Sequence, residues 1–269
     1  MKILITGGTG WLGKKLVAEY VQRGYEVTIL SRNEYNQWRL QQKHTDIKCI
    51  LHDIRRPLEI KEYYDVIIHT AALKHVSTGV QYPDEVVDTN VNGTRNIAHF
   101  AYTNAKHLIY ISTDKAVDPL NWYGETKEKG EDITWECPGS TVIRFGNLFG
   151  SSGSFVEIMA RKVLLNDCNI EISDPKSERF FLTYEDAIEL IDKAMREKPR
   201  LLIGKYKALK IVDLVNYVFE GANISYVGLR EGEKLKEKLY DIKYDYYTEP
   251  EVQEMFLKYF NEYTGDQLV

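Results

Sequence analysis

Short apolar segments alternate with longer amphipathic segments over the first half of the chain. The apolar segments are bounded by polar residues or glycine, as is typical of strands buried on both faces of a sheet. They cover residues 2–6, 26–31, 65–70 and 107–112. Residues 13–23 and 85–104 instead repeat apolar side chains at the spacing of one helical face. Strands that alternate with helices predict an α/β protein with a Rossmann-like, doubly wound parallel sheet.

The regular alternation weakens after one more apolar segment at residues 141–145. We therefore expect a first domain over residues 1–150 and a smaller C-terminal lobe over residues 151–269, interleaved with the first at an approximate boundary. Three helical patterns follow the first domain. They cover residues 155–165, 184–197 and 249–260.

Composition and charge narrow the function classes. The chain has 269 residues, and its 35 Lys and Arg against 40 Asp and Glu give a formal charge of -5. This balance disfavours nucleic acid binding by a broad basic surface. No apolar run reaches the roughly 18 residues that span a bilayer, and the first strand follows Met1 too closely for a signal peptide. We expect a cytoplasmic protein with no membrane partner.

The cysteines give no sign of a metal centre. Cys49, Cys137 and Cys168 stand far apart and without Cys-x-x-Cys spacing. We therefore predict no disulfide framework and no metal site.

The first predicted strand runs directly into a glycine-rich loop, TGGTGWLG, at residues 6–13. Glycine lets the backbone turn tightly and approach a pyrophosphate, which binds the N–H groups at the start of the next helix. A lone Gly-x-Gly-x-x-Gly match is weak, and a glycine-rich turn without a ligand is the alternative. Here the motif lies within a βαβ unit, the context that it requires. The predicted cofactor contacts are Gly7, Thr9, Gly10, Trp11, Leu12 and Gly13.

The end of the second predicted strand favours NADP over NAD. An acidic residue there would bind the ribose 2′-hydroxyl of NAD, but the chain has Ser31 and Arg32, and arginine can pair with a 2′-phosphate. The alternative for Arg32 is a solvated surface charge. Asp53 and Ile54 follow a third predicted strand near residues 49–52. The fold predicts that Asp53 accepts from the adenine amino group, and a loop-capping role is the alternative.

Tyr123 and Lys127 carry the candidate chemistry. Four residues apart on a helix, they share a face, so the ammonium can lower the phenol pKa and hold a nicotinamide ribose. Such a tyrosine can remove a hydroxyl proton as hydride leaves for the cofactor. Thr113, Asp114 and Lys115 follow the strand at residues 107–112 and add a hydroxyl and two ionisable groups. In isolation, Asp114 and Lys115 would form a surface turn pair.

With the glycine loop, these residues resemble the extended short-chain dehydrogenase/reductase superfamily, from Met1 to about residue 240. Further segments are similar to the soluble inverting UDP-N-acetylglucosamine 4,6-dehydratases, which begin the pseudaminic acid pathway and related sugar modification routes. These segments are AALKHV (71–76), TNVNGT (89–94), STDKA (112–116), RFGN (144–147) and GLREGEKL (228–235). The similar dTDP-glucose dehydratases typically have Asp-Glu, so Lys115 favours the UDP-N-acetylhexosamine branch.

The resemblance implies a tightly bound NADP and a catalytic cycle. Tyr123, aided by Lys127 and Thr113, would take the 4-hydroxyl proton while the C4 hydride passes to NADP. Lys115 would then remove the C5 proton, and Asp114 would help to expel water from C6. Hydride would return to C6, and protonation of C5 from the opposite face would invert that centre. The product would be a UDP-4-keto-6-deoxy-N-acetylhexosamine for surface glycans or glycoproteins.

The resemblance also implies ligand contacts and a homo-oligomer. Ala71, Ala72 and Lys74 would line the cofactor. The residues expected to face the UDP-sugar are Lys74, Asn147, Arg179, Arg230 and Glu233. The alternative for Arg230 and Glu233 is an ion pair on a charged loop.

The chain departs from the family pattern in two places. The family often has an arginine in the stretch at residues 150–154, where this chain has GSSGS, and the C-terminal end is shorter than in many relatives. Alternative functions are a retaining dehydratase, a 4-epimerase or a 4-reductase on another nucleotide sugar, or a non-catalytic NADP-binding scaffold. The presence of the five predicted catalytic residues argues against the scaffold.

Overall fold

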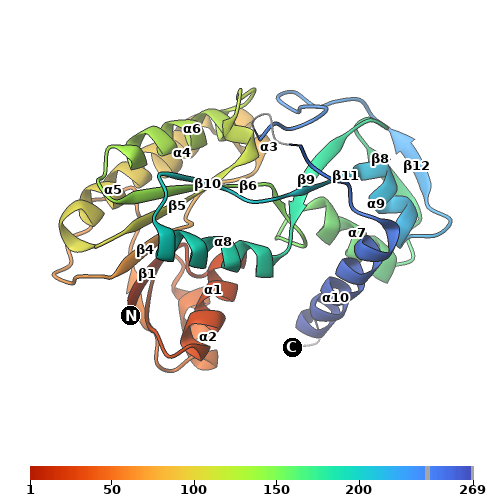
Figure 1. Ribbon diagram of the computed structural model, residues 1–269. Helices are drawn as coiled ribbons and strands as arrows, with labels where there is room; N and C mark the ends of the chain where they lie inside the picture. Colours follow the sequence, from red (N-terminus) through yellow and green to blue (C-terminus); the bar gives the residue numbers. More distant parts are fainter. Residues whose placement is uncertain (240–242, 268–269) are drawn as a thin grey trace. The chain divides into compact units, whose positions relative to one another are not determined.

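The computed structural model describes residues 1–239 and 243–267, which form two compact units (Figure 1). Unit 1 comprises Met1–Phe145 and Glu185–Gly204, and unit 2 comprises Gly146–Tyr184 and Lys205–Val269. The chain thus passes from one unit to the other three times. A single division at residue 150 would put Glu185–Gly204 in the C-terminal lobe, whereas the structure assigns this stretch to unit 1.

A seven-stranded sheet forms the centre of unit 1. Its order is β10-β6-β5-β4-β1-β2-β3, and all neighbouring strands are parallel. The strands are β1 (Lys2–Thr6), β2 (Glu26–Ser31), β3 (Lys48–Leu51), β4 (Val66–His69), β5 (Leu108–Thr113), β6 (Ser140–Phe145) and β10 (Leu201–Ile203). The order reverses at β1, which confirms the predicted doubly wound sheet. Because β10 pairs with the edge strand β6, the stretch that carries it belongs to unit 1.

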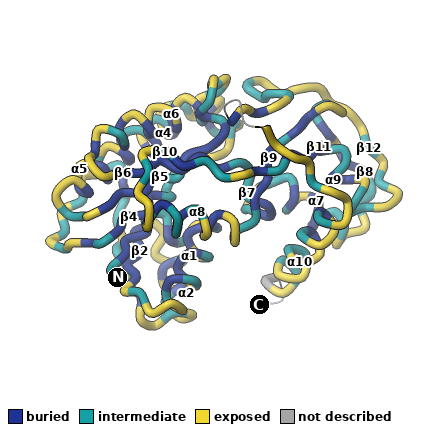
Figure 2. Tube along the Cα trace, in the orientation of Figure 1, coloured by how far each residue is buried: buried dark blue, intermediate teal, exposed yellow. Residues whose placement is uncertain are grey.

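Helices cover both faces of this sheet, with α1, α2 and α8 on one face and α4, α5 and α6 on the other (Figure 1). The sheet residues Ile3, Leu4 and Ile5 are fully buried between these layers, and the central strands are dark blue in Figure 2. The helices are α1 (Trp11–Gln22), α2 (Glu34–Lys43), α3 (Val76–Gln81), α4 (Pro83–Val87), α5 (Gly93–Asn104), α6 (Trp122–Trp135) and α8 (Tyr184–Glu197). A short 3-10 turn, η2 (Asp114–Ala116), follows β5.

The prediction of one continuous helix at residues 85–104 is wrong in one respect, because a π-helical turn interrupts the helix. α4 ends at Val87, the π turn η1 spans Asp88–Asn92, and α5 begins at Gly93. The Asn90 side chain accepts from the Leu73 N–H at 2.8 Å and donates to the Leu73 carbonyl at 2.9 Å. It also donates to Thr126 Oγ1 at 3.1 Å. Turns of this kind are rare and often mark functional sites. This one connects the loop after β4 to α6.

Within the described residues, unit 2 contains two small sheets with helices packed on them. One sheet has the order β11-β9-β7, and the other pairs β12 with β8. The elements are β7 (Asn147–Leu148), α7 (Phe155–Leu164), β8 (Asn169–Ile172), β9 (Glu178–Leu182), β11 (Lys207–Lys210), α9 (Ile211–Val218), β12 (Asn223–Tyr226) and α10 (Glu249–Gln267). The helices predicted at residues 155–165, 184–197 and 249–260 are present as α7, α8 and α10, and α10 continues beyond the predicted end.

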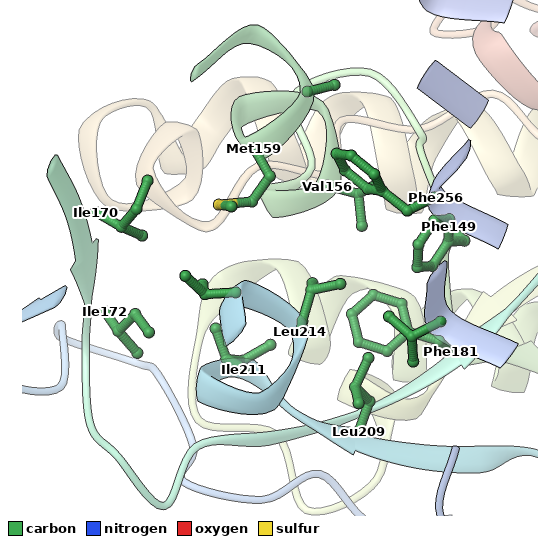
Figure 3. Packing of buried hydrophobic residues seen from close by; sticks show 13 residues of the cluster. Phe149, Val156, Met159, Ile170, Ile172, Phe181, Leu209, Ile211, Leu214 and Phe256 are labelled. Atoms are coloured by element: carbon green, nitrogen blue, oxygen red, sulfur yellow. The ribbon is translucent and has the colours of Figure 1, made fainter. Parts of the chain in front are cut away.

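Apolar side chains from these sheets and helices fill the interior of unit 2 (Figure 3). Phe149 and Phe181 pack edge to face, with ring centroids 5.8 Å apart. α10 adds Val252 and Phe256 to the same cluster. This core fixes β9, which carries Arg179. None of the helices in the described part of the chain is long and apolar enough to cross a membrane.

Candidate active site

The loop between β1 and α1 has the close packing that a dinucleotide phosphate loop requires. Gly7 has a φ of +69°, and a Cβ built on it would lie 2.9 Å from the Ala71 backbone. A Cβ on Gly13 would lie 2.3 Å from the Gly7 carbonyl oxygen. Gly10 precedes α1 as its N-cap residue and provides no side-chain cap for the first turn. These residues therefore fit a dinucleotide whose phosphates bind the backbone N–H groups of this turn. Thr9, Trp11 and Leu12 lie in the same loop and turn.

Arg32 stands beside Asp53 at the end of β2. Its guanidinium lies 3.8 Å from the Asp53 carboxylate, and its side chain is 52% exposed. Arg55 holds the same carboxylate through Nε and Nη2 at 2.9 and 2.6 Å, and it lowers the pKa of Asp53. Ser31 accepts from the Gln37 amide at 3.0 Å. The structure thus brings Arg32 and Asp53 together with Arg55, a cation that the sequence prediction does not include.

The remaining predicted cofactor residues lie around the loop after β4. Ala71 and Ala72 are partly buried and Lys74 is exposed. The Thr70 hydroxyl donates to the Thr6 carbonyl at 2.7 Å, which joins this loop to the end of β1. Ile54 is buried against Gly93, where a Cβ would lie 2.6 Å from the Ile54 side chain.

Thr113, Asp114 and Lys115 form a hydrogen-bonded cluster at the end of β5. The Thr113 hydroxyl donates to Asp114 Oδ1 at 2.9 Å, and Lys115 Nζ donates to the same oxygen at 3.0 Å. The Asp114 side chain is fully buried, and that of Lys115 is 18% exposed. Asp114 Oδ2 is buried and has no hydrogen-bond partner among the described residues. Of the two Asp114 carboxylate oxygens, Oδ1 therefore accepts two hydrogen bonds, and Oδ2 accepts none from the described residues.

α6 carries Tyr123 and Lys127 next to this cluster. The Asn121 side chain caps the helix by accepting from the Gly124 N–H at 2.9 Å. A Cβ built on Gly124 would lie 2.3 Å from the Lys115 carbonyl oxygen. Glycine at this position thus allows the first turn of α6, which includes Tyr123, to contact the backbone of Lys115.

Lys127 is buried and lies one helical turn after Tyr123 on α6. Its Nζ donates to the Ile111 carbonyl at 2.6 Å and lies 3.9 Å from the centroid of the Tyr110 ring. Burial lowers the pKa of Lys127 to about 7, and the negative charge of Glu131 opposes part of this effect. A lysine that changes charge near neutral pH can influence proton transfer by a neighbouring phenol.

The predicted substrate residues other than Lys74 lie in unit 2. Arg179 on β9 donates to Glu233 Oε1 at 2.8 Å and to the Leu235 carbonyl at 3.1 Å. The Arg230 N–H approaches Glu233 Oε2 at 3.3 Å, while the Arg230 side chain is exposed. Asn147 donates to the Phe180 carbonyl at 3.2 Å, next to Arg179 in the chain. The structure therefore gathers these residues around β9 within one unit. The ion pair is between Glu233 and Arg179, not Arg230.

Asn90, Glu131 and Arg144 have no role in the sequence predictions, although all three are buried in unit 1. Glu131 follows Lys127 by four residues, so the helical spacing that pairs Tyr123 with Lys127 could have identified it. Asn90 lies in the TNVNGT segment but needs the π turn to reach Leu73. No group of three or more His, Cys, Asp or Glu side chains in the described residues could hold a metal ion.

Sequence relatives include nucleotide-sugar enzymes. A protein of Methanocaldococcus jannaschii named "Uncharacterized membrane protein MJ1061" is 32% identical over 96% of this chain and 85% of its own length. A "UDP-glucose 4-epimerase" of Rickettsia massiliae is 31% identical over 88% of this chain and 76% of its own. A "UDP-N-acetylglucosamine 4,6-dehydratase (inverting)" of Campylobacter jejuni is 29% identical over 87% of this chain and 76% of its own.

Solved structures share the fold. Pen from Bacillus thuringiensis has a TM-score of 0.81 and 31% identity, over 87% of this chain and 80% of that one. DesIV, a dTDP-glucose 4,6-dehydratase from Streptomyces venezuelae with NAD bound, has a TM-score of 0.81 at 18% identity, over 98% of both chains. Residues 3–259 match the family described as "Polysaccharide biosynthesis protein". The chain therefore belongs to the polysaccharide biosynthesis protein family and has the fold of the extended short-chain dehydrogenase/reductases.

Proposed function

We propose that the chain is a cytoplasmic UDP-N-acetylglucosamine 4,6-dehydratase that inverts C5 and uses NADP. The observation that carries this proposal is Asp114, which is fully buried and whose Oδ2 has no hydrogen-bond partner among the described residues. Leaving a buried polar atom unpaired costs free energy, and such atoms are often kept for chemistry. Lys115, at 3.0 Å from the other oxygen, supplies a second ionisable group. Removal of water from a sugar needs both a base and an acid.

The glycine loop and Arg32 would hold the cofactor. The backbone of the loop suits the phosphates, and the Arg32 guanidinium suits a 2′-phosphate because it is cationic and half-exposed. When bound, the nicotinamide would accept a hydride from C4 of the sugar and return it to C6.

The residues of the chain would move the protons. Tyr123 takes the 4-hydroxyl proton, and Lys127 stabilises the phenolate charge when it is itself protonated. Oxidation of C4 acidifies the proton on C5, which Lys115 removes. Asp114 protonates the departing 6-hydroxyl, so that water leaves and the C5–C6 double bond forms. A proton that derives from solvent then adds to C5 from the opposite face and inverts that carbon.

The residues of unit 2 are assigned to the UDP end of the substrate. Arg179 presents a guanidinium that is bonded to the Glu233 carboxylate at 2.8 Å. A guanidinium that holds a carboxylate in this way suits a diphosphate equally well, because both ligands offer paired anionic oxygens.

A 4-epimerase is the second candidate, favoured by the identity to the Rickettsia enzyme. Epimerisation needs the tyrosine base and the cofactor but leaves the 6-hydroxyl in place. It therefore gives no role to the unpaired Asp114 oxygen.

NMR of the product in deuterated water tests the proposal. Incubation with UDP-N-acetylglucosamine should give a 4-keto-6-deoxy sugar with inverted C5 and deuterium at C5. Lys115→Met should abolish the C5 exchange and leave NADP binding nearly unchanged. Lys129→Met is the matched control because Lys129 is exposed on α6, and it should behave as the wild type. A product that keeps its 6-hydroxyl and carries no deuterium at C5 would refute the dehydratase assignment.

A further inference from the structure

Glu131 and Arg144 form an ion pair that is almost fully buried, with side chains 1% and 7% exposed. Neither residue belongs to the predicted catalytic set. Glu131 lies one helical turn beyond Lys127 on α6, so the two side chains share a face. Arg144 lies on β6, opposite Ser112 of β5 in the strand register.

Side chains from β6 and β5 hold the Glu131 carboxylate in place. Arg144 donates to it through Nε at 2.8 Å and Nη2 at 2.5 Å, and the Ser112 hydroxyl donates to Oε1. A bidentate guanidinium holds a carboxylate in its charged form and in one orientation. Removing either partner of such a pair would leave an uncompensated buried charge, whereas the intact pair is electrically balanced. Glu131 is therefore kept ionised and in one orientation on α6, with its side chain only 1% exposed.

Lys127 is the buried cation that this charge acts on. The Ile111 carbonyl and the Tyr110 ring hold its ammonium from β5. His69 on β4 is neutral near pH 7 because burial lowers its pKa to about 3, and burial raises the pKa of Tyr110 far above its ordinary value. Tyr123 is on the same helix, one turn before Lys127. The Glu131 charge raises the pKa of Lys127 against the larger effect of burial.

We propose that Glu131, held in place by Arg144, is a positioning residue that keeps Lys127 charged, one helical turn after the predicted tyrosine base. The Arg144 guanidinium fixes the carboxylate, and the fixed carboxylate attracts the Lys127 ammonium on the same helix face. Lys127 in turn stabilises the phenolate of Tyr123. This role rests on the proposed function for its effect on catalysis, while its effect on Lys127 can be measured without any turnover.

The direct test is NMR of the protein labelled at lysine Cε. Lys127→Met identifies the Lys127 signal, whose midpoint near pH 7 separates it from surface lysines. Glu131→Gln should move this midpoint to lower pH by about one unit, since loss of a close opposite charge has an effect of that order. Glu131→Asp keeps the charge and should restore the wild-type midpoint. An unchanged midpoint in Glu131→Gln would overturn the proposal.

Two further variants separate charge from packing. Thr141→Val removes a buried hydrogen bond to His107, 2.9 Å long, from the same strand β6 without changing a charge, so the Lys127 midpoint should not move. If Glu131→Gln fails to fold, the double variant Glu131→Gln/Arg144→Gln leaves no unpaired buried cation. Its midpoint should move in the same direction by a smaller amount, and no movement would again overturn the proposal.

The activity readout then connects this charge to the reaction. The alkaline limb of the pH–rate profile, where Lys127 loses its proton, should move to lower pH in Glu131→Gln and remain in place in Thr141→Val. Lower activity with an unmoved limb would assign Glu131 a purely structural role and contradict the inference. If the wild type has no dehydratase activity, the proposed function fails, and the NMR midpoint still decides the role of Glu131.

Discussion

Replacing Gly124 by alanine should separate α6 from the turn that carries Lys115. The added Cβ would lie 2.3 Å from the Lys115 carbonyl oxygen, where ordinary contact begins at 3.4 Å, so the two segments must move apart by about 1 Å. Overpacking of this kind costs about 1–3 kcal/mol, and alanine regains at most about 1 kcal/mol through its helix preference. We therefore expect a net decrease of up to about 2–3 kcal/mol in the free energy of unfolding.

The same displacement should lower activity far more than it lowers stability. A misplacement of about 1 Å between reacting groups can reduce a rate by about 10²-fold, so deuterium exchange at C5 should slow by about that factor. Urea denaturation measures the stability, and NMR of the folded variant measures the exchange rate.

Gly265→Ala is the matched control for this substitution. Gly265 lies in α10, and a Cβ built on it meets no atom of the described residues within 4 Å. This variant should keep the wild-type exchange rate and lose no stability. Wild-type exchange in folded Gly124→Ala would refute the claim that this close contact positions Lys115.

Arg32→Asp should weaken NADP binding by about 10- to 100-fold, because a hydrogen bond to a charged group contributes about 1.5–3 kcal/mol. NAD binding should weaken less, and equal losses measured by calorimetry would contradict the 2′-phosphate assignment. Lys127 has a pKa of about 7 in the folded protein against 10.5 for an ordinary lysine. Between these values the unfolded chain binds the extra proton, so the free energy of unfolding should rise with pH across this window. Lys127→Met should lose this rise, and identical pH dependence in denaturant titrations of the two proteins would disprove it.

The sequence predicts the central sheet well because its strands are continuous apolar runs. In β1, Ile3, Leu4 and Ile5 are buried between two helical layers, and no polar residue interrupts this run. The small strands of unit 2 give a much weaker signal. β8 has only four residues, in which Ile170 and Ile172 alternate with exposed neighbours. The three residues of β10 contain nothing that says which sheet they join, so its pairing with β6 could not be foreseen.

The arrangement of the candidate site was predictable where it depends on spacing along one element. Tyr123 and Lys127 are four residues apart on a helix, and Asp114 and Lys115 are adjacent, so their proximity needs no tertiary information. The partnership of Glu131 with Arg144 joins a helix to a strand 13 residues away, and no local pattern encodes it. The pairing of Arg179 with Glu233 joins residues 54 positions apart, so local sequence patterns could not predict it either.

The threefold passage of the chain between its units has a consequence for the construction of chimeras. Unit 2 is built from two separate stretches, Gly146–Tyr184 and Lys205–Val269, with Glu185–Gly204 returned to unit 1 between them. A chimera joined at one point near residue 150 would import a foreign α8 and β10 into unit 1, where β10 belongs to the central sheet. Grafting the lobe of a relative therefore requires two exchanged segments and three junctions, with the native strand β10 left in place beside β6.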